Sequence, residues 1–528
     1  MIKMFNQIQL IINTVKYLKF KQLFYQLYYR FKKRKSLIDY LGEDFVFKKL
    51  SFRVSIDSKS MIIGDNHFKF LNLEKKFEGN VDWTFQDYGK LWNYNLQYFD
   101  YLFQAAISDN IKTALLEDFD KALTNRIIPL EPYPVSLRII NCIRFFSSEQ
   151  ETGNLLKGVY AQLRYLYDNL EYHILGNHLL ENAFALTMGG AAFSVEVWLK
   201  RGKRVLIKEL QEQILNDGGH FELSPMYHKI ILFRLLELID WYENTENAED
   251  DFLDFIKQKA MKMLSWLHTI SLNDNTTPYF NDSADNVAYT NPELFTYAKQ
   301  LGLYSPETIA LKESGYRNFT FKNYQAVVDA GQIGASYQAG HAHADALSFV
   351  IYHKDKPLLV EAGTSTYQTG EKRNYERSTK AHNCVVVEDT NQSEVWGGFR
   401  VGNRAITIIE EENDSRLVAS HDGYKRQFGV MHRRSFTFEQ DQVTISDSLI
   451  PNKHNTLAKA YFHFYPDQNI RMEGNSIYVD DVKRIFFEKT RRISIENYQY
   501  ALEYNTYKTG KVVVVLFDST LDSTIFLD

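Results

Sequence analysis

The chain has 528 residues, a net charge of −5, 45% hydrophobic residues and 24% charged residues. This length exceeds one ordinary hydrophobic core and predicts two or three domains, while the composition excludes wholesale disorder. The pI near 6.3 argues against a dedicated nucleic-acid-binding protein. Two cysteines, Cys142 and Cys384, are too few for a disulfide framework or a cysteine-rich zinc module. Since no apolar run reaches about 18 residues, no membrane span is predicted.

The first 35 residues are basic, and no acidic residue precedes Asp39. Their apolar core is short, is interrupted by Asn13, and is not followed by a small-residue cleavage site, so the segment is a poor secretory signal. It is typical of a basic amphipathic helix. Such a helix can lie on an anionic membrane surface or a partner, or it can pack on its own protein with a solvated basic end.

The hydrophobic spacing changes twice along the chain. Residues 40–85 contain short alternating runs that predict a small cap or a few strands. Residues 86–315 carry apolar side chains at helical spacing, joined by short polar links, which predicts serial helices in paired hairpins or a toroid. From residue 316, short segments rich in β-branched and aromatic residues alternate with turn signals. We therefore expect an α+β multidomain protein, with an N-terminal helix and cap in 1–85, a helical domain in 86–315 and an antiparallel β-sandwich in 316–528.

The densest polar cluster is "GHAHADALSFVIYHKDKPLLVEAGT". On an extended chain His341 and His343 point to one side, just before a strand. A hairpin at "HKDKP" returns the chain to Glu361, and His382 begins another strand. If that strand is a neighbour, His343, Glu361 and His382 meet at one sheet edge and can hold Zn²⁺ with an open position for water. Otherwise each is an ordinary polar residue at a strand end. His341 would face the cleft beside the metal, as a proton carrier near neutral pH.

Two clusters in the helical part also carry polar side chains. In "DGGHFELSPMYHK", Ser224 and Pro225 start a helix whose first turn contains Tyr227 and His228. The helix dipole there would lower the pKa of a phenol, so Tyr227 could act as base or acid; the alternative is a structural tyrosine. In "LGNHLLENAFALTMGGAAF", the polar residues form either a core network or a cleft wall.

Taken together, "GNHLLENA", "GGHFELSPMYH", "GHAHADALSF", "PLLVEAGT" and "RSTKAHNCVVVED" resemble the heparinase II/III family of polysaccharide lyases, over roughly residues 85–440. The resemblance implies an incomplete (α/α) toroid followed by antiparallel β-sheets, and cleavage of a uronic-acid-containing polysaccharide by β-elimination. It implies that Tyr227 and His341 are catalytic, and that Asn177 and His178 neutralise the uronate carboxylate. It also implies that His343, Glu361 and His382 hold a structural divalent cation resembling zinc.

The resemblance extends to the surroundings of these residues. Glu181 occupies the position of a supporting acid and His228 adjoins Tyr227, and both are expected among the residues that bind the substrate. Arg373 and Arg377 are either contacts for an anionic sugar or parts of a solvated loop. Glu361 departs from the Asp that is usual in the family and lengthens the arm that carries the carboxylate.

The expected partner is an acidic polysaccharide. Secreted lyases carry a signal peptide, whereas none is read here. This predicts a cytoplasmic or inner-membrane-associated protein that makes or trims a surface polysaccharide, with the periplasm as the alternative location.

Three other functions compete with this interpretation. A glycoside hydrolase on the same toroid needs two carboxyl groups about 5–10 Å apart; the candidates are Asp217, Glu222, Asp282 and Asp285. A metal-dependent amidohydrolase is disfavoured because "HAHAD" here begins a strand, after a wholly helical half. A non-catalytic polysaccharide-binding or assembly protein could use the same cleft, although the retained Tyr227 and His341 count against it.

Overall fold

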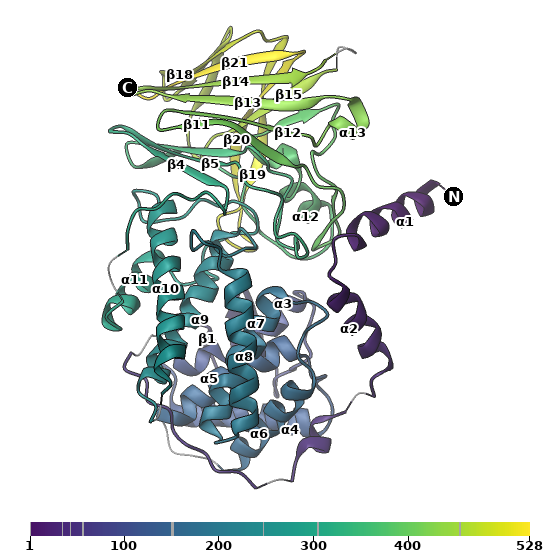
Figure 1. The fold of residues 1–528 in the computed structure, drawn as a ribbon, viewed down its shortest axis with the longest axis vertical. Coiled ribbons are helices and arrows are strands. Elements are labelled where there is room, and N and C mark those ends of the chain that lie inside the picture. The colour runs from purple at the N-terminus through teal and green to yellow at the C-terminus, as the bar shows by residue number, and fades with distance from the viewer. Residues whose placement is uncertain are drawn as a thin grey trace.

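The computed structural model describes residues 2–33, 35–42, 44–54, 58–148, 153–246, 248–303, 306–452 and 456–528. Helices gather in one half of the molecule and strands stack in the other, as Figure 1 shows. The largest hydrophobic core lies among the helices, and a second core fills the space between the sheets. Among the described residues, no helix is both long enough and apolar enough to cross a membrane.

The helical half is built around a close pair of central helices. Its helices are α3 Lys90–Tyr98, α4 Asp109–Thr124, α5 Pro132–Ser148, α6 Gly153–Asp168, α7 Gly176–Ala192, α8 Glu196–Gln213, α9 Pro225–Glu243, α10 Asp250–Ile270 and α11 Asn291–Gln300, with the 3-10 helix η2 Asp100–Phe103. Helix α7 is buried on nearly every side because its sequence is apolar all round. It approaches α8 closely at Gly190, where a β-carbon would lie 2.3 Å from the backbone nitrogen of Leu199.

The second half consists of antiparallel sheets. An eight-stranded sheet has the order β11-β12-β13-β14-β21-β18-β17-β16, and two four-stranded sheets have the orders β19-β20-β15-β8 and β4-β5-β6-β7. Their bounds are β4 Tyr316–Thr320, β5 Tyr324–Asp329, β6 Phe349–His353, β7 Lys356–Leu359, β8 Val385–Val387, β11 Thr407–Asn413, β12 Arg416–His421, β13 Met431–Phe438, β14 Gln442–Ile450, β15 Ala458–His463, β16 Ile470–Glu473, β17 Ser476–Val479, β18 Val482–Glu488, β19 Arg492–Tyr500, β20 Lys508–Phe517 and β21 Thr520–Phe526. Alternating burial along β14 directs Val443 and Ile445 into the shared core, as expected for a sheet with one packed face.

Loops of the strand half reach down to the helices and connect the halves. An isolated bridge pairs Asp285 of the helical half with Glu503 of the strand half, and a second bridge pairs Gly363 with Ala501 within the strand half. Gly363 is required at the second bridge, because its φ is +79° and a β-carbon would lie 2.0 Å from the Ala501 carbonyl oxygen. The remaining elements are α12 Glu371–Glu376, η3 Thr379–Ala381, β9 Val395–Trp396, β10 Arg400–Val401 and α13 Lys425–Phe428.

The N-terminal region differs from the single helix predicted over its first 35 residues. It forms two helices, α1 Ile2–Val15 and α2 Phe20–Phe31, separated by an extended backbone at Lys19. The break allows α1 to rest on the strand half, where Asn13 donates to Glu394, while α2 rests on the helical half, where Gln22 donates to the Ile174 carbonyl. The cap region that follows contains η1 Leu37–Tyr40 and a small sheet of β1 Ile62–Gly64, β2 His67–Phe70 and β3 Leu73–Lys76.

Candidate active site

A cavity of about 1480 Å³ lies between the two halves and is lined by both. The helical half contributes Asn177 and His178 from the first turn of α7, and Tyr227 from the first turn of α9. The strand half contributes His341, from the loop before β6, and Tyr367. The structure therefore brings the four predicted catalytic residues to one cavity large enough for several sugar rings.

Tyr227 of the helical half and His341 of the strand half are in direct contact at this cavity. Their rings stack with centroids 3.8 Å apart. Ser224 caps α9 as predicted, because its hydroxyl accepts a hydrogen bond from the Tyr227 backbone N–H. The Tyr227 hydroxyl lies 3.3 Å from the hydroxyl of Tyr367. Burial raises the pKa of Tyr227 well above its ordinary value, so the prediction that the helix start lowers this pKa is wrong. The phenol is protonated in the resting site.

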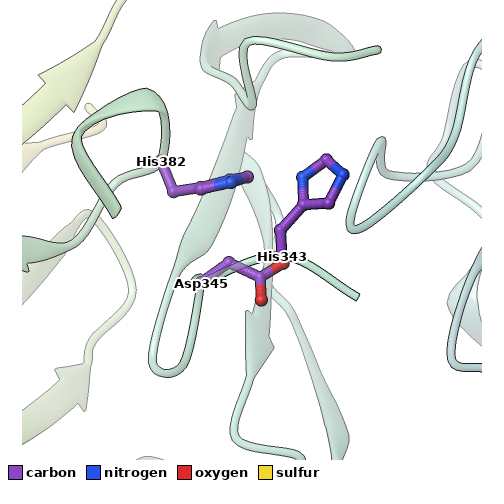
Figure 2. A group of neighbouring side chains, drawn as sticks. All are labelled: His343, Asp345 and His382. Atoms are coloured by element: carbon purple, nitrogen blue, oxygen red, sulfur yellow. The ribbon is translucent and has the colours of Figure 1, made fainter. Parts of the chain in front are cut away.

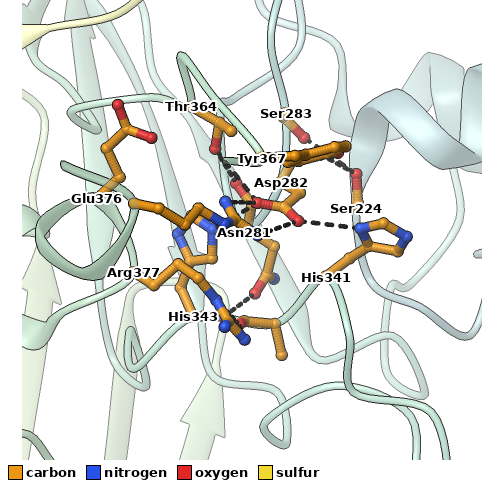
Figure 3. A network of polar contacts seen from close by, with 12 residues as sticks. Ser224, Asn281, Asp282, Ser283, His341, His343, Thr364, Tyr367, Glu376 and Arg377 are labelled. Atoms are coloured by element: carbon orange, nitrogen blue, oxygen red, sulfur yellow. Dashed lines mark hydrogen bonds and ion pairs between the residues drawn. The ribbon is translucent and has the colours of Figure 1, made fainter. Parts of the chain in front are cut away.

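The carboxylate of Asp282 orients His341 through a contact to the ring nitrogen Nδ1, as Figure 3 shows. Its Oδ2 lies 2.9 Å from His341 Nδ1, and its Oδ1 lies 2.9 Å from His343 Nε2. Arg373 donates to both oxygens, at 2.7 Å for Oδ2. Burial alone would raise the pKa of Asp282, but Arg373 and the two histidines outweigh burial and hold it well below its ordinary value. The ionised carboxylate keeps the proton of His341 on Nδ1 and leaves Nε2 directed away from Asp282.

The first turn of α7 presents an amide and an imidazole. Asn177 Nδ2 donates to both oxygens of the buried Glu222, at 3.1 and 2.9 Å. His178 Nδ1 lies 3.1 Å from Glu171, and its ring packs on Tyr133 with centroids 4.2 Å apart. Burial alone would lower the pKa of His178, but the charge and hydrogen bond of Glu171 outweigh burial and raise this pKa. Glu171 therefore makes His178 easier to protonate than a free imidazole, which suits an anionic ligand.

A candidate metal centre lies behind His341. His343, Asp345 and His382 offer ligand atoms that all lie within 4.8 Å of one another, and Figure 2 shows the three side chains together. Among the described residues, His343 Nδ1, Asp345 Oδ2 and His382 Nε2 are buried polar atoms without a hydrogen-bond partner. Such orphaned atoms are costly unless something binds them, and two imidazoles with one carboxylate suit Zn²⁺. The residues present therefore fit a divalent cation.

This metal centre is assembled differently from the prediction. Strand β8, which follows His382, pairs with β15 rather than with β6 or β7, so the two histidines lie in segments that lead into strands of different sheets instead of meeting at one sheet edge. Glu361 contacts His382 Nδ1 and accepts a hydrogen bond from Ser348. It thus lies on the side of the His382 ring that is opposite the orphaned Nε2. Asp345 occupies the place predicted for Glu361, and Glu361 orients His382 as carboxylates commonly orient metal-binding histidines.

Four residues predicted to contact the substrate lie behind the cavity wall. Arg373 and Arg377 are 0% exposed; the first binds Asp282 and the second donates to the Ala342 carbonyl at 2.9 Å. His228 is also 0% exposed and lies 3.0 Å from the Met263 carbonyl. Glu181 accepts from Arg234 at 3.1 Å. None of the four is among the residues that line the cavity, and each is bonded to another part of the protein, so these side chains support the site from behind its wall.

The acids proposed for a hydrolase are also placed by the structure. Asp285 lines the cavity, where it accepts a hydrogen bond from Tyr279. Asp217 caps a loop by accepting from Ser314, Glu222 is held by Asn177, and Asp282 is paired with Arg373. These three do not face one another across the cavity as an acid and base pair would.

Some residues of the site were not predicted in their present roles. Asp345 stands two positions after His343 in "HAHAD", so the spacing alone could have indicated a third ligand. Tyr367 and Glu171 carry no local signal, because they reach the cavity only through long-range packing.

Comparisons with known proteins agree with this geometry. The family model described as "Heparinase II/III N-terminus" matches residues 139–307, and "Heparinase II/III-like, C-terminal" matches residues 305–524. A heparin-sulfate lyase of Bacteroides stercoris is 26% identical over 325 residues, which cover 55% of this chain and 46% of the relative. The FtsZ-localized protein C of Caulobacter vibrioides is 24% identical over 362 residues, covering 63% of this chain and 61% of the relative.

A solved structure supports the architecture. The crystal structure of heparinase III superposes with a TM-score of 0.68 at 17% identity, over 93% of this chain and 88% of that one. This similarity confirms the predicted fold class, a helical toroid followed by an antiparallel β-sandwich. The chain spans less than half the length of the curated heparin-sulfate lyases it matches, between 39% and 46%.

Proposed function

The chain belongs to the heparinase II/III-like family, and from this premise we propose that it is a carbon–oxygen lyase that cleaves a uronic-acid-containing polysaccharide by β-elimination. The observation that carries the proposal is the stack of Tyr227 on His341 within a cavity that both halves line. A proton donor and a proton acceptor thereby lie side by side, close enough to act on one monosaccharide. We further propose a surface polysaccharide as the substrate.

The elimination requires one proton to be removed and one to be delivered. His341 takes the proton α to the uronate carboxylate on Nε2, because Asp282 holds its Nδ1. The electron pair of the broken C–H bond forms the double bond, and the bond from the next carbon to the glycosidic oxygen breaks. The protonated Tyr227 donates its phenolic proton to that oxygen. Glu222 Oε2 lies 3.7 Å from His341 Nε2 and stabilises the imidazolium that forms.

Negative charge grows on the uronate carboxylate as the proton leaves, so the site must stabilise it. His178 supplies a cation at the cavity wall, since Glu171 raises its pKa. Asn177 is the second donor in the proposal, and its amide exchanges Glu222 for the substrate carboxylate when the sugar binds. Removing one such donor typically lowers the rate about 10²–10³-fold.

The metal centre has a structural role in this proposal. His343, Asp345 and His382 would hold a divalent cation, for which we propose Zn²⁺, and Glu361 would orient His382. When bound, the cation supplies a cross-link between the loop that carries His341 and the start of β8. The proton transfers are carried by His341 and Tyr227.

The proposal is tested by incubating the purified chain with a panel of uronate-containing polysaccharides. Each eliminative cut leaves a conjugated double bond in the sugar at the new non-reducing end, so ultraviolet absorbance rises with cleavage. We expect Tyr227→Phe to lose this signal and Tyr478→Phe, on β17, to keep it. New reducing ends without ultraviolet absorbance would identify a hydrolase and overturn the proposal.

A second candidate is a non-catalytic polysaccharide-binding or assembly protein. It is favoured by the similarity to FtsZ-localized protein C, whose name gives a location instead of a reaction. In that case neither the wild type nor a Tyr227→Phe, His341→Ala double variant would yield product from any polymer. The wild type would still bind one of the polymers.

A further inference from the structure

The N-terminal arm, defined as helices α1 and α2, exposes an apolar stripe on each of its two helices. In α2, Phe20 is 81% exposed and Phe31 is 82% exposed, and Phe24 and Leu27 lie between them at spacings of four, three and four residues. This spacing places the four side chains on one side of the helix. In α1 the exposed apolar side chains follow the same rule: Ile8, Ile11, Ile12 and Val15. Single exposed apolar residues are ordinary, but contiguous stripes mark binding surfaces.

The opposite side of the arm is fixed to the rest of the protein. Gln22 is 1% exposed and donates to the Ile174 carbonyl, and the Tyr25 ring packs on Tyr172 with centroids 4.8 Å apart. In α1, the Trp396 indole N–H donates to Thr14. The arm therefore has a protein-facing side with specific contacts and an outward side that is apolar.

Charge identifies the occupant of the outward side. No acidic residue precedes Asp39, whereas Arg30, Lys33 and Lys35 are exposed at the C-terminal end of α2 and just beyond it. An apolar stripe flanked by basic residues matches the interface of an anionic lipid bilayer, where apolar side chains enter the headgroup boundary and lysines meet lipid phosphates. A second copy of this chain fits less well, because two arms of the same positive charge would repel each other.

We propose that the arm binds the surface of an anionic lipid bilayer through the apolar stripe of α2, with α1 extending the same contact. This inference goes beyond the lyase activity and does not depend on it. It has one consequence for the proposed site: Tyr29, Lys32 and Lys35, at the end of the arm, also line the cavity. The bilayer would thus lie beside the cavity, where polymers presented at a membrane surface arrive first.

The test is co-sedimentation of the full chain with vesicles of phosphatidylcholine alone or of phosphatidylcholine mixed with anionic phosphatidylglycerol. We expect sedimentation with the mixed vesicles, weakened by added salt because exposed charges are screened. We call the variant with Phe20→Ser, Phe24→Ser, Leu27→Ser and Phe31→Ser the stripe variant. Its binding to the mixed vesicles should be at least roughly tenfold weaker, because it loses the apolar area that the stripe would bury in the bilayer. Its fold should persist, since these side chains are exposed.

Two matched variants make the result specific. The sandwich variant Ile406→Ser, Ile408→Ser, Ile450→Ser and Val482→Ser removes the same number of exposed apolar side chains elsewhere, each 45–55% exposed, and we expect it to bind vesicles like the wild type. The variant Arg30→Gln, Lys33→Gln should lose the preference for anionic vesicles.

Equal sedimentation of the stripe and sandwich variants would overturn the proposal. So would a wild-type dimer in sedimentation velocity that the stripe variant converts to monomers, without vesicle binding by either. Lyase activity is measured separately on dissolved polymers, so a failure of one proposal is distinguishable from a failure of the other.

Discussion

Tyr227 and His341 stack ring on ring, with their planes 28° apart, although Tyr227 opens helix α9 and His341 lies in the loop before β6. The contact joins the helical half to the strand half at the cavity. Because each ring belongs to a different half, the proposed acid and base depend on how the halves dock as well as on their own chemistry.

The phenolic hydroxyl of Tyr227 is the group whose removal should stop elimination. Tyr227→Phe keeps the ring stacked on His341 but deletes the proton donor, so we expect kcat to fall about 10²–10⁴-fold. The midpoint of thermal unfolding should hardly change, since the hydroxyl has only the 3.3 Å contact with Tyr367. Tyr367→Phe is the control and should lower kcat much less. Unchanged turnover in Tyr227→Phe would remove this residue from the site.

Asp282 should matter for stability as well as for activity. Asp282→Asn removes the charge that pairs with the fully buried Arg373, and breaking such a buried pair typically costs about 3–5 kcal/mol in free energy of unfolding. It also releases the Nδ1 proton of His341, so turnover should fall. Asp285→Asn, which alters an acid at the cavity wall, serves as the control for chemical denaturation and kinetics. An Asp282→Asn protein as stable as the wild type would contradict the role assigned to this carboxylate.

At the metal centre, substitutions should distinguish the residues that would bind the cation from the carboxylate that orients one of them. We expect His343→Ala and Asp345→Asn to lower bound metal, measured by elemental analysis, together with the unfolding midpoint. Glu361→Gln should reduce metal affinity less, about 10–100-fold, as outer carboxylates do. His421→Ala, in a separate buried histidine contact with His432, should lower stability while leaving the metal content unchanged. Full metal content in His343→Ala would exclude this ligand.

The pair of His178 and Glu171 should make stability depend on pH. The folded pKa of His178 is raised above its unfolded value, because Glu171 outweighs the effect of burial. The pair therefore stabilises the fold fully below the unfolded pKa, and this stabilisation is lost as pH rises through the folded pKa. The difference in free energy of unfolding between the wild type and Glu171→Gln should shrink over that rise. Glu196→Gln, on the exposed face of α8, should show no such trend, and a pH-independent difference for Glu171→Gln would contradict the coupling.

Local features of the site were predictable from the sequence. The change from helical to strand spacing near residue 316 coincides with the start of β4 at Tyr316, and the cap formed by Ser224 and Pro225 begins α9. The turn at "HKDKP" joins β6 to β7, with His353 opposite Lys356. These features depend on residues within a few positions of one another, so a single sequence carries them.

Other features required contacts between distant segments. The N-terminal segment divides into two helices because α1 packs on the strand half and α2 packs on the helical half. Strand β8 belongs to a different sheet from β6. Arg373 and Arg377 lie in a segment with the composition of a solvated loop. They are nevertheless fully buried, because Asp282 and backbone carbonyls of the strand half accept their hydrogen bonds. Burial of Tyr227 likewise reverses the expected shift of its pKa.

The sequence by itself determined which segments are helices and strands, where the two kinds meet, and which motifs carry the polar chemistry, because spacing and capping act over one or two turns of chain. Only the tertiary structure decided that Asp345 joins His343 and His382, that Asp282 orients His341, and that the outward side of α2 stays uncovered. These outcomes depend on desolvation and charge pairing between residues far apart in the chain, and neither acts until the segments that carry these residues have packed together.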